Sequence, residues 1–197
     1  MSVFNFIQTA IKNPISTGAV APSSRFLARE ILRYWPEDKK GLIVEYGPGT
    51  GAFTKVVDQK LNSENYVGLE LNPDFTKNLN KFYPHLDILE KSAADLPEVI
   101  QSKSLPNPSL IISGLPWANF NPELQKSILG STVENLDQEG TFSTFAYVHA
   151  LKLKKAQAFK GLLQDHFSDV ATSKVIWRNL PPAVIYHCRK PLKKGKS

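Results

Sequence analysis

The sequence contains little cysteine and no long hydrophobic run. Its single cysteine, Cys188, excludes an intrachain disulfide framework and a metal site built from cysteines alone. No apolar run approaches the ~18–20 residues that a membrane-spanning helix needs. The first dozen residues lack a basic stretch followed by an apolar one, so we expect no secretory signal. A chain of 197 residues, 42% hydrophobic and 10% aromatic, predicts one soluble intracellular domain over residues 1–197.

Acidic residues are missing from the C-terminal end of the chain. Residues 170–197 carry seven basic side chains and no acidic one, whereas residues 41–139 carry 13 acidic and seven basic ones. The net charge is +6. An acidic centre with basic ends favours a partner that bears phosphates, either nucleic acid or an anionic membrane surface. For the tail over 189–197, a merely solubilising role is an equal alternative.

Short apolar runs alternate with helical stretches. The predicted strands are 42–46, 66–70, 86–90, 109–113 and 141–148. The predicted helices are 23–34, 53–61, 73–82, 122–136 and 151–166. This alternation indicates an α/β fold, a parallel sheet with helices on both faces. Two further strands, 170–177 and 183–188, predict a closing antiparallel hairpin, hence a seven-stranded, mostly parallel sheet.

A glycine-rich loop follows the first predicted strand. Gly47, Gly49 and Gly51 permit positive φ and let a ligand lie against the backbone at a helix N-terminus. Glu70 ends the next strand, where a carboxylate can accept both hydroxyls of a ribose. A tight structural turn is the alternative. Together, these residues predict a nucleoside site.

Two features favour S-adenosylmethionine over a nicotinamide cofactor. Glu45 lies two residues before the first glycine, where its carboxylate attracts an ammonium group and repels a pyrophosphate. In addition, 197 residues leave no room for the second substrate domain that a dehydrogenase usually carries.

A second loop follows the fourth strand. In sheets of this topology, the carboxyl end of that strand borders the cofactor crevice. Gly114 and Pro116 shape the loop, and Trp117 offers a flat face to a cationic or aromatic acceptor. A plain turn with a buried Trp is the alternative.

At these motifs the chain resembles the bacterial soluble-type phospholipid N-methyltransferases, which are related to the ribosomal RNA adenine dimethyltransferases. The resemblance covers nearly the whole chain and rests on five segments: 14–24, 45–51, 68–72, 113–117 and 178–183. It implies the class I S-adenosylmethionine-dependent methyltransferase (Rossmann-like) fold and methyl transfer to phosphatidylethanolamine. It also implies a cytoplasmic protein attached peripherally to the inner face of the membrane, with no metal.

The chain departs from the RNA enzymes at three places. Those enzymes usually begin the second loop with Asn or Asp, where this chain has Gly114, which has no side chain to accept from a base amine. After the third strand, Ser92 and Ala93 stand where an acid usually meets the adenine, and Asp95 lies slightly beyond. The helical substrate domain of the RNA enzymes is also missing. Nucleic acid is therefore not the expected partner.

The motifs and the resemblance together assign candidate site residues. The predicted cofactor-binding residues are Gly18, Ser23, Ser24, Glu45, Gly47, Gly49, Gly51, Glu70, Leu71, Ser92, Ala93, Ser113, Gly114 and Leu115. Because an amine must be neutral to attack, a desolvated aromatic pocket favours the reaction. Trp117 and Tyr147 are the predicted wall of that pocket, and His149 the predicted proton acceptor, with a solvated surface histidine as its alternative. Pro116 and Arg178 are predicted to contact the lipid substrate.

The N-terminal residues 1–40 are predicted to form a helical lid or membrane-contact segment over a core of residues 41–188. Phe4, Ile7 and Ile11 share one helical face, which fits either membrane docking or packing against the core.

Three functions remain open at this point. The first is phosphatidylethanolamine N-methylation, with mono- and dimethylated forms as further substrates. The second is RNA adenine N6-methylation, and the third is a non-catalytic basic module that binds lipid or RNA. The intact glycine loop and Glu70 favour an enzyme.

Overall fold

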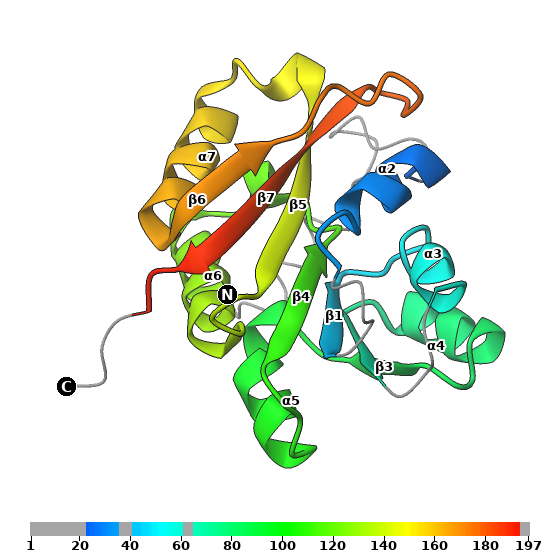
Figure 1. Ribbon diagram of the computed structural model, residues 1–197. Coiled ribbons are helices and arrows are strands. Elements are labelled where there is room, and N and C mark those ends of the chain that lie inside the picture. The colour runs from blue at the N-terminus through cyan, green and yellow to red at the C-terminus, as the bar shows by residue number, and fades with distance from the viewer. Residues whose placement is uncertain (1–22, 36–40, 61–64, 194–197) are drawn as a thin grey trace.

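A computed structural model describes residues 23–35, 41–60 and 65–193. Seven strands form one sheet in the order β3-β2-β1-β4-β5-β7-β6 (Figure 1). The strands are β1 (Leu42–Tyr46), β2 (Tyr66–Glu70), β3 (Asp87–Glu90), β4 (Pro108–Ser113), β5 (Thr141–Tyr147), β6 (Phe167–Thr172) and β7 (Ala183–Pro191). β1 to β5 run parallel, and β7 is antiparallel to both of its neighbours. The predicted α/β class, the seven strands and the closing hairpin are confirmed.

Helices cover both faces of the sheet. One core contains the buried residues of α2 (Arg25–Ile31), α3 (Thr54–Asp58) and α4 (Pro73–Phe82). The other contains those of α5 (Leu96–Ser102), α6 (Pro122–Asn135) and α7 (Lys154–His166). The described residues also form three short 3₁₀ helices: η3 (Ala93–Asp95), η4 (Trp117–Asn119) and η5 (Val148–Ala150).

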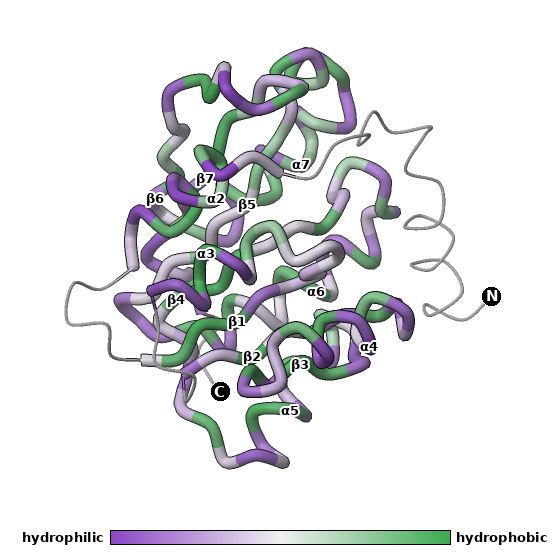
Figure 2. The backbone as a smooth tube through the Cα atoms, turned by 90° about the vertical axis from the view of Figure 1, so that its right-hand side faces the viewer, coloured by the Kyte–Doolittle hydropathy of each residue, from purple (hydrophilic) through white to green (hydrophobic). Residues whose placement is uncertain are grey.

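Side chains of one strand alternate between the two cores. In β1, Ile43 packs in the core of α2 to α4, whereas Val44 and Tyr46 pack in the other. Figure 2 shows hydrophobic residues along the central strands β1 and β2. Within the described residues, no helix has both the length and the apolar composition needed to cross a membrane.

The register brings the functional loops to one edge of the sheet. Glu45 lies opposite Gly68 and Ile112, and Ser113 lies opposite Thr144. The ends of β1 to β5 therefore meet at what we term the carboxyl edge. β7 begins at this same edge, because Ala183 pairs with Tyr147. The connection over 173–182 consequently lies beside the loops that follow β4 and β5.

One strand and one helix differ from the prediction. The strand predicted over 170–177 is instead β6, which ends at Thr172, because the Ser173 hydroxyl accepts the Ile185 amide (2.9 Å). Pairing moves from Thr172–Tyr186 to Ile176–Ala183, which leaves one extra residue and a bulge. The sequence analysis also missed α5. Its Pro97 stands in the first turn, where a helix needs no N–H.

The predicted lid over 1–40 is wrong for the part that the structure describes. Leu27, Ala28 and Ile31 of α2 are completely buried against the sheet, so α2 belongs to the core. Residues 1–22 and 36–40, and the last four residues of the predicted basic tail, lie outside the described residues.

Candidate active site

The glycine loop after β1 is held by its neighbours at the carboxyl edge. Gly47 donates to the Leu69 carbonyl (2.9 Å), and Gly49 donates to Oε2 of Glu70 (2.8 Å). Gly49 has φ 57°, and among the described residues a Cβ placed there would meet only the Gly47 carbonyl oxygen, at 3.9 Å. The described part of the chain therefore leaves space above Gly49, where a ligand can approach the backbone.

Glu70 is a buried acceptor at the end of β2. Its Oε1 accepts from the Asn72 amide (2.8 Å). Burial raises the pKa of the Glu70 carboxyl, and the backbone amides of Asn72 and Gly49 oppose that rise. Each carboxylate oxygen has a second lone pair. Both oxygens can therefore accept one further hydrogen bond from a ligand.

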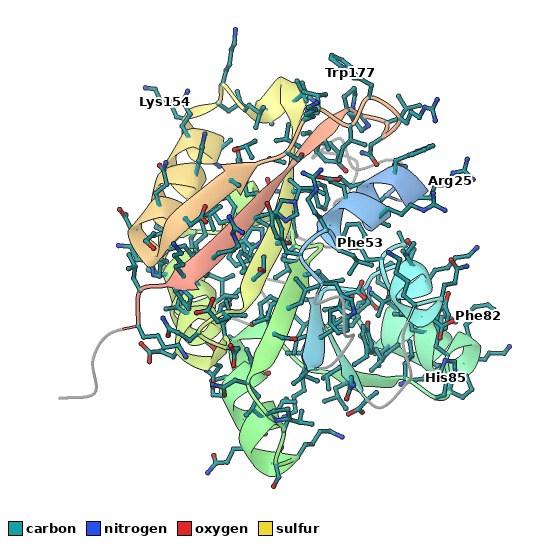
Figure 3. The ribbon with its side chains drawn as sticks, viewed as in Figure 1. Arg25, Phe53, Phe82, His85, Lys154 and Trp177 are labelled. Carbon is teal, nitrogen blue, oxygen red and sulfur yellow. The ribbon has the colours of Figure 1, made fainter. Side chains whose placement is uncertain are left out.

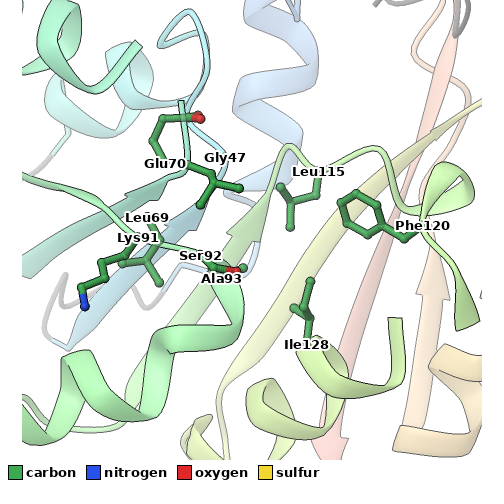
Figure 4. A pocket seen from close by; sticks show the side chains of 10 residues that line it. Gly47, Leu69, Glu70, Lys91, Ser92, Ala93, Leu115, Phe120 and Ile128 are labelled. Atoms are coloured by element: carbon green, nitrogen blue, oxygen red, sulfur yellow. The ribbon is translucent and has the colours of Figure 1, made fainter. Parts of the chain in front are cut away.

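A narrow pocket lies between Glu70 and the loop after β4 (Figure 4). Ser92 and Ala93 are on one side, and Leu115, Phe120 and Ile128 are on the other. Six of the predicted cofactor residues line it: Gly47, Glu70, Leu71, Ser92, Ala93 and Leu115. Its free volume is only about 20 Å³, which is too small for a purine with the side chains as they stand. The cofactor roles of these six residues remain predictions.

Ser92 and Asp95 form a capping box at the start of η3. The Asp95 carboxylate accepts the Ser92 amide (2.9 Å), and the Ser92 hydroxyl accepts the Ala94 amide (3.2 Å). Asp95 is thus engaged by the backbone.

Glu45 lies beneath the glycine loop with no exposed surface. Its Oε2 accepts from the hydroxyls of Tyr66 (2.7 Å) and Thr54 (3.0 Å), while Oε1 has no hydrogen-bond partner among the described residues. Burial raises the pKa of Glu45 to about 7, although both hydroxyls oppose the rise. The predicted partner of an ammonium group is therefore sealed from solvent, and only Oε1 is left to receive a cation.

We expect the Glu45→Gln variant to gain stability relative to the wild type as the pH rises. Between the ordinary pKa of 4.5 and the folded value of about 7, the folded chain binds more protons than the unfolded one. The free energy of unfolding of the wild type therefore falls with rising pH, whereas a neutral amide adds no such slope. From about pH 5 to about pH 8, urea unfolding should show a relative gain of up to ~3 kcal/mol for the variant.

Glu98→Gln is the control, since Glu98 is a well-exposed residue paired with Lys91. A stability difference between Glu45→Gln and wild type that stays constant across this pH range would contradict the assignment.

The loop after β4 packs directly on the glycine loop. Gly114 donates to the Tyr46 carbonyl (2.8 Å), and a Cβ at Gly114 would lie 2.8 Å from the Gly47 carbonyl oxygen. Any side chain at this position would collide with backbone. The hydroxyl of Ser113, predicted to bind the cofactor, is buried and accepts from the Leu115 amide (3.3 Å) and the Trp117 indole (3.0 Å). Ser113 therefore shapes the loop from inside.

Trp117 lines the pocket that opens beside this loop, but most of its ring is covered by other side chains. Trp117 is only 3% exposed, and its indole stacks on Phe159 at 4.9 Å between ring centroids. Phe120 and Phe142 contact it edge-on, and Gln125 donates to its carbonyl (2.7 Å). The alternative, a turn with a buried Trp, is what the structure contains.

Trp117→Ala should therefore act mainly on stability. Removing a buried indole should lower the free energy of unfolding by ~3–5 kcal/mol, as measured by urea denaturation. Tyr147→Ala, at a half-buried position, should cost clearly less. Equal losses for the two variants would argue against the buried role of Trp117.

A second, larger pocket opens at the carboxyl edge beside this loop. Its volume is about 400 Å³, and its walls come from the loop after β4, the end of β5, and the aromatic residues Phe159 and Tyr186. The predicted acceptor-site residues Pro116, Trp117, Tyr147 and His149 all line it, and their roles remain predictions. The rings of Tyr147 and His149 stack at 5.7 Å with 11° between their planes. We term this space the aromatic pocket.

Several other predicted site residues lie away from both pockets. Gly51 and Ser23 line a separate groove with Arg25, Arg29 and Lys55. The amide of Ser24, which is predicted to bind the cofactor, donates to Oδ1 of Asn179 (2.9 Å), and the Ser24 hydroxyl caps α2. Gly18 lies outside the described residues.

Arg178 and Asn179 have contrasting surroundings. The Arg178 guanidinium lies 4.9 Å from the ring centre of Phe26 on α2, outside the lining of the aromatic pocket. The sequence analysis missed Asn179, which is buried and also donates to the Pro181 carbonyl (2.7 Å). A signal was available, since buried Asn residues commonly brace turns rich in proline.

Comparison with known proteins identifies the fold. No protein-family model matches the chain. The ornithine lipid N-methyltransferase of Singulisphaera acidiphila is 29% identical over 190 residues, which cover 94% of this chain and 95% of the relative. A TehB-like SAM-dependent methyltransferase from Corynebacterium glutamicum superposes with a TM-score of 0.60 at 12% identity, covering 94% of this chain and 96% of that one. The fold is that of the class I methyltransferases.

The same fold occurs in a putative rRNA methylase from Clostridium thermocellum. That structure has a TM-score of 0.58 and 17% identity, and the match covers 85% of this chain and 94% of that one. In a class I methyltransferase fold, the crevice outside the carboxyl ends of the strands is the ligand site. Both pockets described above lie at that edge.

Proposed function

We propose that the protein transfers a methyl group from S-adenosylmethionine to the amine of a membrane lipid. The observation that carries this proposal is the shared wall between the two pockets. Leu115 lines both the narrow pocket beside Glu70 and the aromatic pocket. A donor and an acceptor held on either side of one loop residue can bring nitrogen, methyl carbon and sulfur into line.

The residues at the glycine loop fit the cofactor. The open space above Gly49 admits a ligand against the backbone, and the Glu70 oxygens can accept from ribose hydroxyls. Glu45 lies beneath the loop with no exposed surface and lines neither pocket, so its contact with the methionyl ammonium stays a prediction. Bound S-adenosylmethionine supplies an electrophilic methyl group on a sulfonium.

The aromatic pocket suits the acceptor amine. A lipid ammonium is mostly protonated in water, whereas a poorly solvated site disfavours its charged form. Tyr147 is half-buried in the wall, and burial raises the pKa of its own hydroxyl, which keeps the phenol neutral. His149 is exposed at the mouth, where it can accept the released proton directly or through water.

Phosphatidylethanolamine is the lipid that we propose first, because the sequence motifs resemble enzymes acting on it. Ornithine lipid is the second candidate, because the relative with 29% identity is named for that substrate. Both lipids join a primary amine to an anionic group, a phosphodiester or a carboxylate. A base amine fits less well, because no side chain at Gly114 can accept from it.

The direct experiment uses the purified full chain with methyl-labelled S-adenosylmethionine. One arm contains vesicles of phosphatidylethanolamine and phosphatidylglycerol, a second contains ornithine lipid in place of phosphatidylethanolamine, and a third contains total RNA. Label in either lipid supports the proposal and identifies the substrate, and mass spectrometry counts the methyl groups. Label in RNA alone would overturn it.

Glu70→Gln should weaken binding of S-adenosylmethionine without unfolding the chain. A glutamine side chain has one acceptor oxygen in place of two, and its NH2 group only donates. Ribose hydroxyls and the backbone amides of Gly49 and Asn72 would then compete for that single oxygen. We expect a rise in the dissociation constant of ~5- to 150-fold by calorimetry. Glu98→Gln should leave the constant unchanged. Unaltered binding in a folded Glu70 variant would remove Glu70 from the site.

A further inference from the structure

Large apolar side chains protrude from the carboxyl edge. Trp177 is 70% exposed and Leu180 is 73% exposed, both on the connection between β6 and β7. Leu153, between η5 and α7, is 59% exposed. Figure 3 shows Trp177 and Lys154 pointing away from the molecule at the same end. Apolar residues gathered on one exposed edge indicate an interaction site.

The segments around these side chains, including most of helix α7, carry basic residues and no acidic one. Residues 147–164 and 170–182 contain no Asp or Glu, and their basic side chains are Lys152, Lys154, Lys155, Lys160, Lys174 and Arg178. Acidic side chains at this edge follow β2, β3 and β4 instead: Asp74, Glu90, Asp95 and Glu123. Over the described residues, the β5 to β7 half of the carboxyl edge is thus basic and apolar, and Arg25, Arg29 and Lys55 add basic charge beside the glycine loop.

Internal hydrogen bonds hold the protruding loops in place. The side chain of buried Asn179 accepts from the Ser24 amide and donates to the Pro181 carbonyl. The backbone amide of Asn179 donates to the Ile176 carbonyl (3.1 Å). The Val148 amide donates to the Pro182 carbonyl (2.9 Å), which ties the loop after β5 to the loop before β7. Trp177 and Leu180 are therefore presented from an ordered base.

The protruding edge is continuous with the aromatic pocket. Leu153 is both exposed and part of the pocket lining, next to His149 and Ala150. A surface that meets Leu153 therefore also meets the mouth of the pocket.

We propose that Leu153, Trp177 and Leu180 form a docking edge that enters the interface of an anionic lipid bilayer. Trp side chains are enriched at the depth of the lipid headgroups, and basic side chains beside apolar ones attract anionic lipids. Docking in this orientation points the mouth of the aromatic pocket at the bilayer. The use of that pocket for a lipid headgroup rests on the proposed function. The binding itself does not require methyl transfer.

The test uses vesicles without an amine lipid, namely phosphatidylglycerol and phosphatidylcholine in equal parts. On binding, Trp177 emission should shift to the blue and be quenched by brominated acyl chains, and Trp177→Phe should abolish that change. The double variant Trp177→Ala/Leu180→Ala should lower the partition coefficient at least ~10-fold in a flotation assay. Phe82→Ala is the matched control, since Phe82 is 73% exposed on α4 and should bind like wild type.

Circular dichroism and thermal melting establish that the double variant is folded. Vesicle binding equal to wild type in that variant, or Trp177 emission that vesicles leave unchanged, would overturn the docking edge. Self-association or RNA binding that depends on these residues, without vesicle binding, would also overturn it. Vesicle binding without methyl transfer to any lipid would leave the docking edge standing and remove the proposed function.

Discussion

The close approach of two backbone segments is the constraint on which both pockets depend. Because β1 and β4 are neighbours in parallel register, the residues that follow them leave the sheet side by side. The Gly114 amide then reaches the Tyr46 carbonyl, and the Gly114 Cα rests against the Gly47 carbonyl with no room for a Cβ. This contact sets Leu115 between the narrow pocket and the aromatic pocket. A larger residue at position 114 would push the two loops apart.

Two buried carboxylates brace the glycine loop from opposite sides. Glu70 accepts hydrogen bonds from the backbone amides of Gly49 and Asn72 at the ends of the strands. Glu45 lies beneath the loop and accepts hydrogen bonds from the hydroxyls of Thr54 and Tyr66. Burial raises the pKa of both carboxyls. Only Glu70 lines a pocket, so Glu70 is the carboxylate placed to accept hydrogen bonds from a ligand.

The carboxyl edge divides into halves of different chemistry. The half near β2 has buried carboxylates and a narrow slot, which suits a polar ligand taken from water. The half from β5 to β7 combines a roomy apolar pocket with basic, protruding loops. An enzyme that joins a water-soluble donor to a lipid needs both surfaces close together, and the strand order supplies that proximity.

Local patterns in the sequence determined the α/β class, the bounds of β1, β2 and α4, and the glycine loop with Glu70, because these depend on short-range periodicity and turn chemistry. The sequence could not reveal which side of a loop faces a cavity. Trp117 looked available to a substrate, yet Phe159, 42 residues away, covers its face. Asn179 was not singled out from the sequence, yet it links the loop before β7 to Ser24. Burial and hydrogen bonding between distant segments arise only when the chain packs, so tertiary structure decided these roles.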